Sequence, residues 1–194
     1  MRTKTVNIYK FDELPEETQQ KAIENYRVKY QGDYAWDNEN QDTLKTFLDL
    51  FSATLTRYGN VKAGYDHGLK GLRLKKWIIN NFWTDIYKQK YYSKYIQNGN
   101  KYRSRYSKIQ WEWNNCSLTG YCMDNDIIKP LIDYIHTPKD DSYELDDVLT
   151  WCYEAFQRSV EKDHEWQDSD EYIIETINAN EYEFHEDGAT GRDA

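Results

Sequence analysis

The chain has 194 residues, with 25 Lys and Arg against 34 Asp and Glu, a formal charge of −9 and an aromatic content of 16%. Its apolar stretches are far shorter than the roughly 18 residues of a membrane span, and the opening residues MRTKTVNIYKF lack the apolar segment of a secretory signal. Disordered chains are poor in aromatic residues. We therefore expect a folded, acidic, cytoplasmic protein with no membrane segment.

The first part of the chain predicts a strand and two helices. Residues 3–11 alternate in polarity, which is typical of a strand. Pro15, flanked by acidic residues, favours a helix start, and that helix should run to about Val28 with Tyr26 and Tyr30 on its buried side. Apolar residues at three- and four-residue spacing predict a second helix over about 39–57.

The middle of the chain predicts mainly strands. Residues 61–67 and 69–79 resemble two strands joined at Gly68, while residues 80–97 are ambiguous. Residues 106–113 alternate again and can pair with 116–122 as a hairpin.

The last third predicts helices over about 124–135 and 145–162, a short helix opened by Asp168, and a closing strand at 181–184. We expect one α+β domain over residues 1–188 and a loose tail at 189–194. In that domain amphipathic helices cover an antiparallel sheet made of the N-terminal strand and strands within 61–122.

Charge is unevenly distributed along the chain. Residues 70–113 hold eleven Lys and Arg and two acidic residues, whereas residues 139–187 hold three Lys and Arg and seventeen acidic residues. Such asymmetry concerns binding partners rather than fold. One alternative is that the two regions neutralise each other inside one domain.

The basic region is interleaved with tyrosine and tryptophan, a mixture that binds single-stranded nucleic acid because bases stack on rings while cations follow phosphates. The acidic region can instead imitate a phosphate backbone. The alternatives are an aromatic core with solvated lysines, and ordinary solvated acidic helix faces. The candidate residues for nucleic-acid or partner binding are Lys75, Lys76, Lys88, Lys94, Arg103, Arg105, Tyr102 and Tyr106.

No recognised catalytic motif is present. Asp66, His67 and Glu112 are the best acid–base cluster, and a nuclease would use such residues to hold Mg²⁺ and activate water. The three cysteines and four histidines have no zinc-site spacing, so we expect no resident metal and no cofactor outside the nuclease hypothesis. An odd number of cysteines fits a reducing compartment.

Three segments resemble a widespread family of small, mostly uncharacterised phage and prophage proteins, some of which carry an antitoxin-like description. They are TVNIYKFDEL at 5–14 followed by PEETQQKAIE, NCSLTG at 115–120 followed by DND at 124–126, and SDEY at 169–172 with NEYEF at 180–184 and EDG at 186–188. Residues 80–105 match no part of this resemblance and are treated as a possible insertion.

The resemblance implies an accessory protein of a phage or mobile element. Small acidic proteins from that setting often disarm host defences, so we expect an anti-CRISPR inhibitor of a Cas9-type nuclease. It would bind the effector or its guide RNA in the cytoplasm of the bacterial host. The alternatives are a metal-dependent ribonuclease that trims guide RNA and an antitoxin-like binding protein. The sequence leaves the target and the oligomeric state open.

Overall fold

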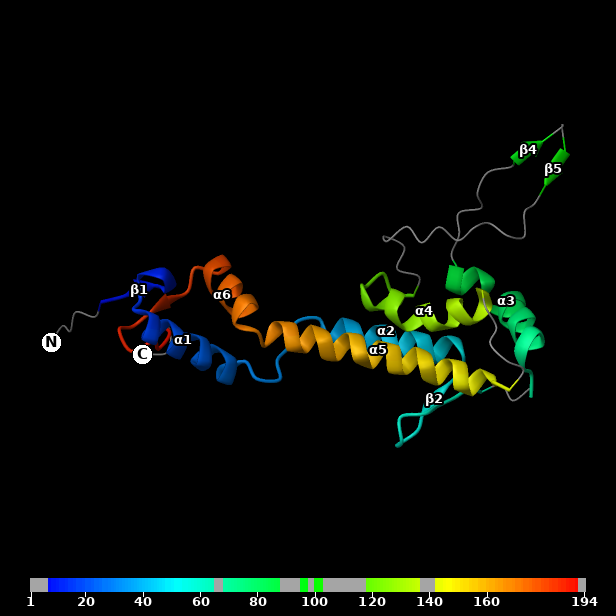
Figure 1. The fold of residues 1–194 in the computed structure, drawn as a ribbon, viewed down its shortest axis with the longest axis horizontal. Helices are drawn as coiled ribbons and strands as arrows, with labels where there is room; N and C mark the ends of the chain where they lie inside the picture. The colour runs from blue at the N-terminus through cyan, green and yellow to red at the C-terminus, as the bar shows by residue number, and fades with distance from the viewer. Residues whose placement is uncertain are drawn as a thin grey trace. The chain divides into compact units, whose positions relative to one another are not determined.

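The computed structural model describes residues 7–64, 68–87, 95–97, 100–102, 118–136 and 142–191. Helices dominate these residues, together with three pairs of short antiparallel strands, which confirms the predicted α+β class (Figure 1). The elements are β1 (Tyr9–Lys10), α1 (Glu16–Lys29), α2 (Asp37–Leu50), β2 (Thr54–Leu55), β3 (Val61–Lys62), α3 (Gly71–Tyr87), β4 (Tyr95–Gln97), β5 (Asn100–Tyr102), α4 (Met123–His136), α5 (Leu145–Gln167), α6 (Asp170–Ala179) and β6 (Glu183–Phe184).

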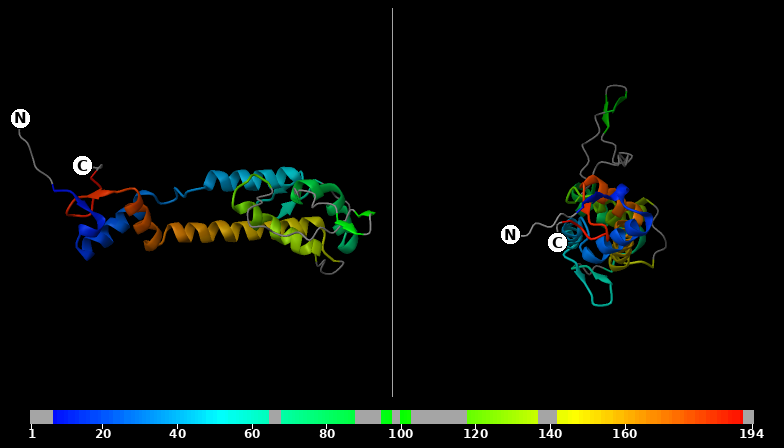
Figure 2. Two further views of the ribbon diagram at one scale, coloured as in Figure 1. Left: turned by 90° about the horizontal axis from the view of Figure 1, so that it is seen from above. Right: turned by 90° about the vertical axis from the view of Figure 1, so that its left-hand side faces the viewer.

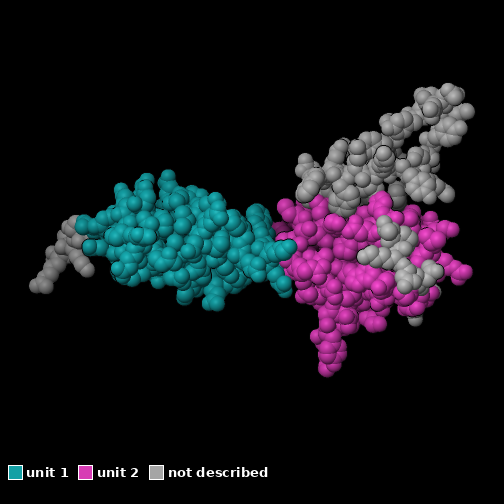
Figure 3. All heavy atoms as spheres, viewed as in Figure 1, with its two compact units in different colours: residues 1–37, 161–194 teal, residues 38–160 magenta. Residues whose placement is uncertain are grey.

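The chain forms two compact units, coloured separately in Figure 3. Unit 1 contains residues 1–37 and 161–194, and unit 2 contains residues 38–160. Each unit has its own cluster of buried apolar side chains.

Unit 1 is assembled from the two ends of the chain. Its strand β1 pairs antiparallel with β6, so that Tyr9 lies opposite Phe184, and α1 packs against α6. The core between these elements consists of apolar residues from both ends, namely Phe11, Leu14, Ala22, Ile23, Ile173, Ile177 and Phe184. The first and last of the resembling segments therefore fold together.

The two helices of unit 1 begin where local chemistry favours it. Pro15 immediately precedes α1, and Glu16 and Glu17 lie in its first turn, where carboxylates interact favourably with the helix dipole. The α6 helix starts after Ser169, whose hydroxyl accepts a hydrogen bond from the backbone N–H of Tyr172 at 3.2 Å. The sequence placed this cap one residue earlier, at Asp168.

A close backbone approach holds the turn after β6 against α1. Gly188 adopts φ +85°, and a Cβ atom there would lie 3.1 Å from the carbonyl oxygen of Thr18 and 3.3 Å from the backbone nitrogen of Ala22. Its carbonyl accepts a hydrogen bond from the side chain of Asn25 at 3.3 Å. Glycine is therefore required here both for its backbone angle and for the space it leaves.

Unit 2 packs α3 against α4 (Figure 2) and includes the hairpin of β2 and β3. The prediction of a strand over 69–79 is wrong, because this segment begins α3. Its buried residues Leu74, Ile78 and Phe82 recur every four positions, which aligns them along one side of a helix. The local alternation of apolar and basic residues obscured this period.

The sheet arrangement also differs from the expectation. The N-terminal strand pairs with β6 rather than with strands of 61–122, where β3 pairs with β2 and β4 with β5. The strand predicted at 106–113 lies outside the described residues. Within the part of the chain that is described, none of the helices combines the length and apolar character needed to cross a membrane.

Candidate partner-binding surface

Unit 1 carries the negative charge of the protein. Its residues hold nineteen Asp and Glu against eight Lys and Arg, a formal charge of −11, whereas unit 2 holds fifteen against seventeen, a charge of +2. Ten of the eleven carboxylate side chains in residues 161–191 are exposed. The acidic segment predicted from the sequence is thus divided, and its strongly acidic part belongs to a unit with few cations.

Several of these charges lie one helical turn from a like charge. Glu161 and Glu165 lie four residues apart on α5, Glu171 and Glu175 do so on α6, and all four side chains are exposed. Like charges at this spacing disfavour a helix by about 0.2–0.5 kcal/mol per pair. The helices form despite these pairs, and the negative potential of the exposed carboxylates extends into solvent.

A pocket of about 290 Å³ lies within unit 1, between α1 with its following loop and the residues that join α5 to α6. Its walls are rich in tyrosine. The rings of Tyr26 and Tyr30 lie 4.6 Å apart. Burial raises the pKa of Tyr26 to about 12, with further contributions from Tyr182, Tyr30 and Tyr172, so its hydroxyl stays protonated near neutral pH. The lining residues are Tyr26, Arg27, Tyr30, Asp33, Tyr34, Ala35, Gln167, Asp168, Tyr172 and Ile173.

Arg27 brings one positive charge to this pocket, and two carboxylates offset it. Its guanidinium donates hydrogen bonds to the carboxylates of Glu24 and Asp170 and to the backbone carbonyl of Asp168. The hydrogen bond to Glu24 raises the pKa of Arg27; burial opposes this rise and Asp170 adds to it. The group joins α1 to the start of α6 and leaves the pocket with a negative balance.

The loop after α1 is fixed to the end of α5 by a series of aromatic and hydrogen-bonded contacts. Tyr34 stacks on the ring of His164 with centroids 3.8 Å apart, and its hydroxyl donates to the Asp168 carboxylate at 2.8 Å. That hydrogen bond raises the pKa of Tyr34. The Nε2 atom of His164 lies 2.8 Å from a carboxylate oxygen of Asp37.

A second set of contacts fixes Ala35, the residue that precedes an exposed tryptophan. The Gln167 side chain accepts from the backbone N–H of Ala35 at 2.8 Å and donates to its carbonyl at 3.3 Å. The next residue, Trp36, has φ 70°, which is rare for a bulky side chain, and is 66% exposed. Trp166 is also exposed, and its ring meets Tyr172 edge to face.

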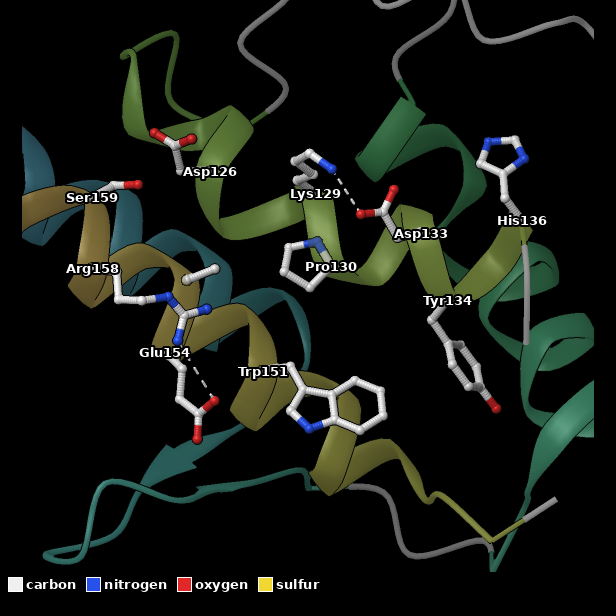
Figure 4. A pocket seen from close by; sticks show the side chains of 11 residues that line it. Asp126, Lys129, Pro130, Asp133, Tyr134, His136, Trp151, Glu154, Arg158 and Ser159 are labelled. Carbon is white, nitrogen blue, oxygen red and sulfur yellow. Dashed lines mark hydrogen bonds and ion pairs between the residues drawn. The ribbon is translucent and has the colours of Figure 1, made fainter. Parts of the chain in front are cut away.

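Unit 2 contains a larger open groove of about 670 Å³ between α4 and α5 (Figure 4). Pro130 and Trp151 lie near its middle, and charged side chains surround them. Lys129 pairs with Asp133 at 2.8 Å, while Arg158 lies 3.9 Å from Glu154. These exposed pairs leave the groove with no dominant sign of charge.

The middle resembling segment has a structural role in unit 2. Asp124 is fully buried, and its Oδ2 accepts from the backbone N–H groups of Leu118, Thr119 and Gly120 at 2.8, 2.8 and 2.9 Å. Its Oδ1 accepts from the hydroxyls of Thr119 and Thr43 at 2.8 and 3.2 Å. Five donors satisfy this carboxylate. It therefore has a structural role, joining the loop before α4 to α2, rather than a catalytic or ligand-binding one.

The predicted catalytic residues Asp66, His67 and Glu112 lie outside the described residues, as do Lys88, Lys94, Arg103, Arg105 and Tyr106. Of the remaining binding candidates, Tyr102 belongs to β5, and α3 carries Lys75, which is half-buried, and Lys76, which is exposed. Over the described ranges, no three His, Cys, Asp or Glu side chains gather closely enough to hold a metal ion.

Comparison with known proteins gives no assignment: no protein-family model, no curated protein and no solved structure matches the chain. The charge and the pocket of unit 1 are therefore the features on which function must rest.

Sequence reasoning missed the tyrosine pocket. Tyr26 and Tyr30 are predicted from the sequence only as part of a buried helix face, although Tyr34 continues their spacing of four residues. The other wall comes from residues more than 130 positions further along the chain, at Gln167 and Asp168. The spacing of the tyrosines could have predicted the wall formed by α1 and its following loop. No local pattern indicated the opposite wall at Gln167 and Asp168.

Proposed function

We propose that this chain is an anti-defence protein of a phage or mobile element, and that it inhibits a Cas9-type RNA-guided nuclease in the cytoplasm of the bacterial host. It acts as a binding protein on the effector, with unit 1 as the contact surface. The single observation that carries the proposal is the concentration of charge, −11 in unit 1 against +2 in unit 2. The choice of a Cas9-type effector is an expectation from the resemblance to phage proteins, which by itself leaves the target open.

The physical basis is electrostatic competition. A nuclease channel lined with Lys and Arg attracts phosphates, and a protein surface dense in carboxylates presents the same sign of charge to it. Complementary potentials speed encounter and oppose wrong partners. Exposed Trp36 and Trp166 add the residue type that most often dominates the energy of protein interfaces.

The test uses purified full-length protein and a panel of guide-loaded Cas9-type effectors, with cleavage of a DNA target as the readout. One variant replaces Glu161, Glu165, Glu171 and Glu175 by Gln. At about 0.3–0.5 kcal/mol for each exposed ion pair, four losses amount to about 1.4 kcal/mol, or a tenfold rise in the inhibitory concentration. Removing like-charge pairs should leave both helices intact.

The control neutralises four exposed acidic residues of unit 2 by D42N, D49N, E144Q and E154Q, of which Glu144 and Glu154 pair with Lys70 and Arg158, and should inhibit within twofold of the unaltered protein. Inhibition by the unaltered protein should weaken as salt rises, because screening acts on exposed charges. Equal effects of the two variants, or absence of inhibition across the panel, would contradict the proposal.

Labelled guide RNA incubated with the protein, with Mg²⁺ or with EDTA, distinguishes binding from degradation. Intact RNA in both tubes supports the binding mode proposed here. Metal-dependent cleavage that is lost in H67A would replace it with the ribonuclease function.

A further inference from the structure

We infer that the tyrosine pocket of unit 1 binds an arginine side chain of the protein partner. This inference rests on the proposed function, because that function requires a partner rich in Lys and Arg. The pocket volume of about 290 Å³ is at the lower limit of small-molecule sites, which suits one long side chain rather than a larger ligand.

The walls of the pocket suit a cation. Tyrosine rings attract a positive group placed over their faces, and four tyrosines line this pocket. The protein already shows the interaction at its edge, where the Lys29 ammonium lies 5.8 Å from the centroid of the Tyr30 ring. A guanidinium can stack on such rings as a plane, which an ammonium cannot.

The carboxylates of the pocket suit a group with several donors. The Asp168 carboxylate accepts from Tyr34 through Oδ2, and among the described residues its Oδ1 has no hydrogen-bond partner. The Asp33 carboxylate likewise has no hydrogen bond or ion pair within the described ranges. Two such acceptors beside tyrosine rings match the donor fork of arginine better than the compact charge of lysine.

The surroundings of the pocket support a protein as the source of that arginine. Trp36 follows the lining residue Ala35, and Trp166 contacts the lining residue Tyr172. Trp36 keeps a left-handed backbone while largely exposed, a strained conformation of the kind that concentrates at functional sites. Exposed tryptophans next to a pocket for a charged side chain form a typical centre for a protein interface.

The test is an NMR titration of full-length, isotope-labelled protein with N-acetyl-arginine amide, and separately with the citrulline and lysine analogues. The arginine compound should give saturable shifts concentrated in residues 26–35 and 167–173. The uncharged citrulline compound should give shifts at least tenfold smaller, and the lysine compound should bind at least threefold more weakly. Scattered, non-saturating shifts, or equal shifts with citrulline, would overturn the inference.

Variants locate the binding. D33N removes a carboxylate that has no hydrogen bond or ion pair within the described ranges, and should weaken arginine-amide binding at least fivefold. D12N removes the same charge from an exposed position of unit 1 outside the pocket lining, and should leave binding within twofold. Y34F keeps the ring but releases Asp168, and should weaken binding. Equal effects of D33N and D12N would refute a localised site.

This titration needs no nuclease, so the two proposals can fail separately. Saturable arginine binding without inhibition of any effector would refute the proposed function and keep the pocket. Inhibition of an effector by a protein that shows no saturable binding of the arginine compound would refute the pocket inference and leave the proposed function standing.

Discussion

Replacement of the buried carboxylate Asp124 should destabilise unit 2 more than any single change on its surface. In D124A, three backbone N–H groups and two hydroxyls lose their acceptor together. A buried donor left without its acceptor costs about 1–3 kcal/mol. Water can reach part of the loop, which is only partly buried, so we expect about 3 kcal/mol in D124A.

Two further variants separate the contributions to this loss. D124N keeps one oxygen for the three backbone N–H groups, and its amide can donate to the hydroxyls, so the expected loss is about 2 kcal/mol. T43V keeps the side-chain volume and removes the Thr43 hydroxyl, which lies 3.2 Å from Asp124 Oδ1 and 3.0 Å from the Thr119 hydroxyl, and should cost about 1 kcal/mol.

Urea unfolding measures the total change, and hydrogen exchange locates it. Because the chain has two compact units, a single transition cannot be assumed. The amides of residues 118–120 should lose protection in D124A, with the amides of α6 in unit 1 as the internal reference. A loss in D124A no larger than in T43V would refute the view that this carboxylate organises the loop.

Three further predictions concern a turn, two thiols and one tyrosine. G188A should lower the free energy of unfolding of unit 1 by about 2–3 kcal/mol in urea, because it adds a close backbone contact to the left-handed φ. G32A, with φ +79° and nothing within 4 Å of its Cβ, should lower it by about 1 kcal/mol. Equal losses in the two variants would contradict the argument from packing. Burial raises the pKa of the Cys152 thiol, so peptide-resolved alkylation of native protein should label exposed Cys122 and spare Cys152 until unfolding. Burial is the main reason that the pKa of Tyr26 is raised from 10.0 to about 12. The unfolded chain therefore loses this proton first as pH rises from 10 to 12, and the free energy of unfolding should fall over that range. The fall should be smaller in Y26F. A pH dependence unchanged in Y26F would argue against a buried phenol.

Local patterns in the sequence were enough to predict several helices and the class of the fold. The acidic start after Pro15 and the apolar spacing of Ile128, Leu131 and Ile135 appear in the structure as α1 and α4. These signals work because helix hydrogen bonds join residues four apart, so one turn of sequence contains both the pattern and its cause. The charge count likewise needs no structure, since charge depends on residue type alone.

Long-range pairing decided the rest. Strands β1 and β6 have two residues each and lie more than 170 positions apart, too short for an alternating pattern to identify a partner. The sequence predicts a strand over 69–79, whereas packing of Leu74 and Ile78 in the core of unit 2 stabilises a helix that begins at Gly71. Tertiary structure alone brought the two ends of the chain together, and with them both walls of the tyrosine pocket. The free energy of those contacts depends on residues that are distant in the sequence, so no local window of sequence contains both partners.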